Sequence, residues 1–101
     1  VSYYAKKEFN DYQMKEIRLG LLDDLDVSIY AHPKYKWEQM EEIRKGLQEN
    51  LDVSIYAKSK FNSQQMIYIR FALLKNVDYS TLIDDDMLIQ IILFLIFLPN
   101  L

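Results

Sequence analysis

Apolar and polar positions repeat along this chain with a period of 26 residues. The sequence VSIYA at residues 27–31 returns unchanged at residues 53–57, and VSYYA stands at residues 1–5. A fixed period between about 20 and 50 residues is typical of proteins built from stacked repeats. We therefore expect one domain over residues 1–101, divided into units 1–26, 27–52 and 53–78 and a degenerate terminal unit, 79–101.

Each unit carries the pattern of one long amphipathic helix. In the first unit Met14, Ile17, Leu21 and Leu25 follow the three-then-four spacing of a single helical face. The helix is expected to span about 13 to 15 residues, close to the average for globular proteins. A residue that tolerates the left-handed conformation follows each helix and should stop it: Asp24, Asn50 and Asn76.

The start of the long helix also has a signature. Asn10 is suited to accept from the free N–H groups of the first turn, and Gln13 can reach back to it as in a capping box. Phe9 and Met14 are spaced as a hydrophobic staple. The third unit repeats these residue types, whereas the second has Lys36 in place of the asparagine, a difference of about 1 kcal/mol in helix stability.

A second, shorter helix of about five to seven residues is expected before each long one. An aspartate stands as a potential N-cap ahead of each Val-Ser or Tyr-Ser pair: Asp26, Asp52 and Asp78. The β-branched residues also permit a strand, but the cap and the following Ala57 and Lys58 favour a helix. These elements predict an all-α fold in which tandem helix pairs form a short right-handed solenoid or a compact helical array.

The pattern Y-A-x-x-x-F-N-x-x-Q-M-x-x-I-R-x-G-L-x-x-x-L-D-V-S resembles a short tandem repeat of uncharacterised bacterial proteins, often from gut Gram-positive species and mobile elements. The resemblance covers residues 1–78 and is poor in the tail. It implies a bacterial source and supports the division into repeats. It implies no activity and no site.

Charge limits the functions that fit. The net charge of −3 and the pI near 5 argue against a broad nucleic-acid surface, which needs clustered Lys and Arg. The third unit is an exception, with four basic residues and one acidic residue. A helix-turn-helix interpretation would place its Lys58, Lys60, Asn62, Ser63 and Gln64 at a DNA groove. The other units have acidic residues at or near the corresponding positions, which would repel phosphate: Glu8, Asp11 and Glu38. A nucleic-acid-binding accessory protein that uses helix-turn-helix-like units is therefore the alternative hypothesis.

An arginine and a glutamine recur beside the apolar face of each long helix, and they are the candidate partner-binding residues: Arg18, Arg44, Arg70, Gln13, Gln39 and Gln65. Such residues could line a groove for an acidic or peptide ligand, since guanidinium groups bind carboxylates in a fork. Alternatively, each arginine covers its own helix pair and pairs with a neighbouring aspartate of the Asp-Val-Ser turn. The second interpretation is favoured, because a residue needed in every unit is what stacking requires.

Candidate catalytic groups are few. His32 is the only histidine and is replaced by lysine in the other units, and there is no cysteine. The carboxylate clusters at residues 23–24 and 84–86 come without a histidine at helical spacing. We therefore expect no enzyme, cofactor or metal site. The lack of cysteine and of a secretory signal is compatible with a cytoplasmic protein.

Residues 87–98 are apolar except for Gln90. This segment is too short to span a bilayer core of about 30 Å and has no flanking Lys or Arg, so a membrane role is not expected. A helix that is apolar on all sides should contact a second chain as well as its own, with Ile92, Phe94 and Phe97 as candidate contacts. The sequence thus predicts a protein–protein interaction or scaffolding module that self-associates and binds a protein or peptide partner.

Overall fold

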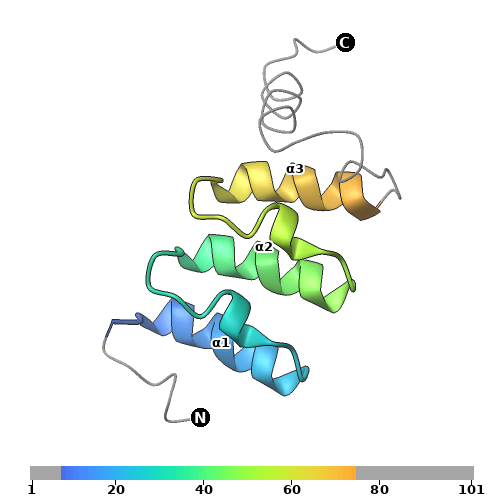
Figure 1. Cartoon of the computed structure of the whole chain (residues 1–101). Helices are drawn as coiled ribbons and strands as arrows, with labels where there is room; N and C mark the ends of the chain where they lie inside the picture. Colours follow the sequence, from blue (N-terminus) through green and yellow to red (C-terminus); the bar gives the residue numbers. More distant parts are fainter. Residues whose placement is uncertain (1–7, 75–101) are drawn as a thin grey trace.

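The computed structural model describes residues 8–74. Within this range the protein is all-α, as predicted, and contains no strand. Three long helices lie side by side in sequence order, each packed on the next, and a short 3-10 turn packs on the helix before it (Figure 1). The elements are α1 (Asp11–Leu22), η2 (Val27–Ile29), α2 (Trp37–Gln48), η3 (Val53–Ile55) and α3 (Ser63–Leu74).

The predicted capping box begins α1. The side chain of Asn10 accepts from the N–H of Gln13 at 2.8 Å, and Gln13 Oε1 accepts from the N–H of Asn10 at 2.8 Å. Helix α3 repeats both bonds. In α2 only the reciprocal bond forms, from the N–H of Lys36 to Gln39 Oε1 at 2.8 Å, because a lysine side chain has no acceptor.

Both helix stops that fall within the described residues are confirmed. Asp24 and Asn50 have φ angles of 56° and 59°, in the left-handed region. The N–H of Leu25 then donates back to the carbonyl of Gly20 at 2.9 Å, which satisfies an otherwise free carbonyl of the last turn. Helices α1 and α2 are therefore 12 residues long, slightly shorter than expected. Asn76 lies outside the described residues.

The expected short helix is wrong in type: it is a single 3-10 turn of three residues. Asp26 caps it as predicted, since its carboxylate accepts from the N–H of Ser28 at 3.2 Å and also from the hydroxyl of Ser28. The turn ends because Tyr30 has a φ of −124°, outside the helical region. Asp52 and Tyr56 repeat the same geometry in η3, and Asp78 lies beyond the described part.

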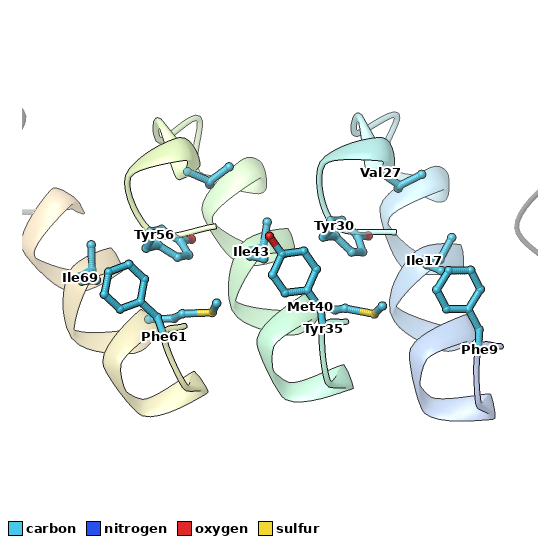
Figure 2. Packing of buried hydrophobic residues seen from close by; sticks show 12 residues of the cluster. Phe9, Ile17, Val27, Tyr30, Tyr35, Met40, Ile43, Tyr56, Phe61 and Ile69 are labelled. Atoms are coloured by element: carbon cyan, nitrogen blue, oxygen red, sulfur yellow. The ribbon is translucent and has the colours of Figure 1, made fainter. Parts of the chain in front are cut away.

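Equivalent residues fill equivalent places in one continuous core. Figure 2 shows this as parallel rows of side chains that run across the three helices. One row consists of isoleucines and another of aromatic rings that stand just before each helix: Ile17, Ile43 and Ile69, and Phe9, Tyr35 and Phe61. Since each of these residues is at most 8% exposed, the units share their apolar surface rather than folding as separate beads.

The buried helical face is shifted from the predicted one. Leu21, expected in the core, is 40% exposed, whereas Gly20 beside it is buried. The reason is that the ring of Tyr30 from the following turn lies directly over Gly20. Its hydroxyl donates to the carbonyl of Glu16 at 2.7 Å.

The second unit reproduces this contact. Tyr56 donates to the carbonyl of Glu42 at 2.7 Å, and a Cβ atom on Gly46 would lie 2.0 Å from the Tyr56 hydroxyl and 2.6 Å from Val53 Cγ1. No larger residue fits beneath the tyrosine without moving it. Burial raises the pKa of Tyr56, so the hydroxyl remains a donor across the neutral range.

We predict that Gly46→Ala lowers the free energy of unfolding by about 1–3 kcal/mol, because the added methyl collides with Tyr56 and Val53. At an open helical position the same change would stabilise by up to about 1 kcal/mol. Urea titration followed by circular dichroism measures the difference. Combining it with Tyr56→Phe should cost less than the sum of the two single changes. A more stable Gly46→Ala protein would contradict the packing.

Candidate functional site

Two of the three recurring arginines, Arg44 and Arg70, lie between successive helices. Arg44 Nε donates to Glu16 Oε1 at 2.8 Å, and Arg70 Nε donates to Glu42 Oε1 at 3.1 Å. All four side chains are at most 11% exposed. The structural interpretation of these arginines therefore applies, but its proposed partner was wrong: the glutamate of the preceding helix takes the place of the aspartate, which caps its own turn.

The two interfaces differ at their rims. Arg70 Nη1 also donates to both carboxylate oxygens of Glu49 at 3.0 Å. Burial by itself would lower the pKa of Arg70, but the hydrogen bonds to Glu49 and Glu42 outweigh it and the pKa is raised. In the first interface the shorter Asp23 accepts from the amide of Gln48 instead. Both arrangements bind one helix to the next through charged groups.

The recurring glutamines also join units. Gln13 Nε2 donates to the carbonyl of Tyr35 at 2.7 Å, and Gln39 Nε2 donates to the carbonyl of Phe61 at 2.6 Å. Each glutamine thus caps its own helix with its oxygen and holds the next unit with its nitrogen. Gln65 makes the capping bonds of α3. The sequence pattern predicts the capping role. It does not predict the hydrogen bond to a main-chain carbonyl 22 residues later.

The first arginine has a different environment. Arg18 is exposed and makes no ion pair within residues 8–74, although it is in register with Arg44 and Arg70. Around it lies a shallow, mostly apolar hollow of about 360 Å³. We call this surface the open α1 face, and its described residues are Lys15, Arg18, Leu19, Leu21 and Leu22.

The equivalent face of α2 is in contact with the preceding unit. Arg44 and Gln48 correspond to Arg18 and Leu22, and both contact α1, through Glu16 and Asp23. The open α1 face is therefore an inter-unit surface without a neighbour among the described residues. Leu22 is 80% exposed there, which is unusual for a large apolar side chain.

Other candidate groups have local structural roles. His32 is exposed, and its Nε2 lies 3.0 Å from the carbonyl of Ser28. A second, more polar hollow of about 440 Å³ lies where the first two units end. Within the described range no three His, Asp or Glu side chains are placed to hold a metal ion. The hollow is lined by Asp23, Leu25, Leu47, Gln48 and Asn50.

The proposed DNA-reading residues do not form a basic recognition surface across the units. Asn62 uses its side chain to cap α3, and the ammonium group of Lys60 lies 5.4 Å from the centre of the Phe61 ring. The starts of the other two long helices expose carboxylates instead, from Asp11 and Glu38. Phosphate attraction would therefore depend on the third unit alone.

We predict that Arg44→Met lowers the free energy of unfolding by about 3–5 kcal/mol, because it leaves the buried Glu16 carboxylate unpaired. The double change Glu16→Met/Arg44→Met should recover most of this loss, since an apolar pair often replaces a buried ion pair at little cost. Lys45→Met is the control: its side chain is 40% exposed, and about 1 kcal/mol or less should be lost. Urea titration measures the free energy of unfolding of each variant. Equal small losses of stability for Arg44→Met and Lys45→Met would contradict the buried ion pair.

Ile92, Phe94, Phe97 and the rest of residues 87–98 lie outside the described part of the chain. Between residues 8 and 74 no helix has the length and apolar character needed to cross a membrane. Comparisons with protein-family models, curated proteins and solved structures found no match. The function must therefore be inferred from the geometry of the chain itself.

Proposed function

We propose that this chain is a protein–protein interaction or scaffolding module, a short right-handed solenoid of repeat units that binds its partner through the open α1 face. The observation that carries this proposal is Arg18, which faces solvent although the arginines at the equivalent positions are ion-paired and at most 11% exposed. Its apolar surroundings supply further surface for contact. Covering Leu22 alone would contribute about 1.5–3 kcal/mol.

The partner's chemistry follows from what covers the equivalent faces. Towards the second unit, helix α1 presents Gln13, Glu16 and Gly20, which are all buried and contact Tyr35, Arg44 and Tyr30 respectively. Helix α2 presents the same three residue types to the third unit. The partner is therefore a helix with Gln, Glu and Gly at positions i, i+3 and i+7, whose carboxylate pairs with Arg18. Lys15 adds a second positive charge that favours an acidic helix.

The nucleic-acid alternative has less support. The open α1 face combines two cations with three leucines, which suits an amphipathic helix better than a phosphate backbone. In the third unit, the side chain of Asn62 is already engaged in capping.

The proposal predicts that a labelled peptide with the sequence of residues 9–26, which carries these three residues, binds the full chain saturably. Arg18→Glu should weaken binding by about tenfold or more, since a carboxylate would then face a carboxylate. Fluorescence anisotropy at physiological salt gives both affinities. A peptide with Glu16→Arg should bind the Arg18→Glu chain better than it binds the native chain.

Lys60→Glu is the matched control, because it makes the same charge change at an exposed lysine of the third unit. It should leave peptide binding unchanged. Absence of binding, or equal weakening by Arg18→Glu and Lys60→Glu, would contradict the assignment of the open α1 face.

A further inference from the structure

The two interfaces between described helices share their buried ion pair and differ at one rim position. Four residues after the paired arginine stands Gln48 on α2 and Leu74 on α3. The preceding helix carries an acidic residue seven positions after its buried glutamate, Asp23 in the first interface and Glu49 in the second. Both interfaces therefore have a second carboxylate at the rim, and the two carboxylates bind different groups.

The side chain at the rim position accounts for this difference. Gln48 has an amide, and the carboxylate of Asp23 accepts from it. Leu74 has no hydrogen-bonding group. Glu49 instead accepts from Arg70 Nη1, and both of its oxygens lie at 3.0 Å. Without an amide at the rim, the second carboxylate thus binds the arginine.

Arg70 holds two carboxylates at once. It donates from Nε to Glu42 at 3.1 Å and from Nη1 to Glu49. A guanidinium group can do so because it has five N–H donors in a fixed plane. The side chain of Glu42 is 5% exposed and that of Glu49 is 32% exposed. The second carboxylate therefore closes the rim of an interface whose centre is already paired.

The open α1 face has the rim residues of the second interface. Leu22 follows Arg18 by four residues, as Leu74 follows Arg70. Leu22 is 80% exposed and offers no donor to a docked carboxylate. Arg18 makes no ion pair within residues 8–74, so its guanidinium has donors for two carboxylates.

We propose that the open α1 face selects a partner helix with two glutamates seven residues apart, that both glutamates bind Arg18, and that Leu22 sets this selectivity. This inference rests on the proposed function and adds a second carboxylate to its partner, three residues after the glycine. An aspartate is the poorer residue there. It is one methylene shorter, and the aspartate of the first interface binds an amide that Leu22 does not provide.

The peptide of residues 9–26 carries Asp23 at this position, so lengthening one side chain tests the inference. The Asp23→Glu peptide should bind the full chain about fivefold more tightly than the native peptide, because the longer carboxylate reaches Arg18. Asp11→Glu is the matched control peptide, since it adds the same methylene in the first turn, and it should bind as the native peptide does. Fluorescence anisotropy at physiological salt gives the three affinities.

Changing the rim residue of the chain should remove the preference. The Leu22→Gln chain supplies the amide that Gln48 supplies in the first interface. It should bind the native peptide at least as tightly as the Asp23→Glu peptide. The ratio of the two affinities is the readout, because losing the leucine side chain affects both peptides alike.

The same exchange can be measured inside the chain without a peptide. Gln48→Leu gives the first interface the rim of the second, and Asp23→Glu then supplies a longer carboxylate for Arg44. Asp23→Glu should therefore raise the folded-to-unfolded equilibrium constant about fivefold more in the Gln48→Leu background than in the native chain. Urea titration of the four proteins measures this coupling.

Three outcomes overturn this inference and leave the proposed function standing. They are equal binding of the native and Asp23→Glu peptides, a preference that Leu22→Gln does not change, and strict additivity of Gln48→Leu and Asp23→Glu. If none of the peptides binds, the proposed function fails and this inference fails with it.

Discussion

Each described unit is fixed to the next at one buried glutamate. The main-chain carbonyl of Glu16 accepts the hydroxyl of Tyr30, and its carboxylate accepts from Arg44. Glu42 makes the same two contacts with the following unit. Glu16 and Glu42 are 3% and 4% exposed. A buried carboxylate costs several kcal/mol unless it is paired, so these positions require a neighbouring unit that places its arginine in register. The tyrosine in turn requires the glycine beneath it.

This constraint explains why the proposed function is assigned to the open α1 face. Most of the recurring arginines and glutamines bond one unit to the next and so do not line a binding groove: Gln13, Gln39, Arg44 and Arg70. Of the three recurring arginines, Arg18 is the one that makes no ion pair within residues 8–74. Under the proposed function, the contacts that hold one unit on the next would also specify what the open α1 face binds.

The sequence predicted the parts that depend on near neighbours. The Asn10–Gln13 box, the Asp26 cap and the left-handed Asp24 each involve residues within a few positions, and their residue types are diagnostic. The long-range contacts were missed or misassigned. A glutamate 28 positions before its arginine reads as an ordinary solvent-facing helix residue, and a glycine inside a helix does not reveal which side chain lies on it. For the same reason the helical pattern predicts Leu21 in the core. In the structure Gly20 is buried beneath Tyr30, and Leu21 is 40% exposed.

The central claim is that the described units share one core and cannot unfold separately. Trp37 is the only tryptophan, and it stacks on Tyr12 of the preceding helix with ring centres 5.7 Å apart, so its fluorescence reports the interface between α1 and α2. Circular dichroism at the helical band reports all the helices together. In one urea titration of the full chain, the account predicts that the two signals change together, with the same midpoint and slope. A tryptophan transition that is complete before most of the helical signal is lost would contradict it.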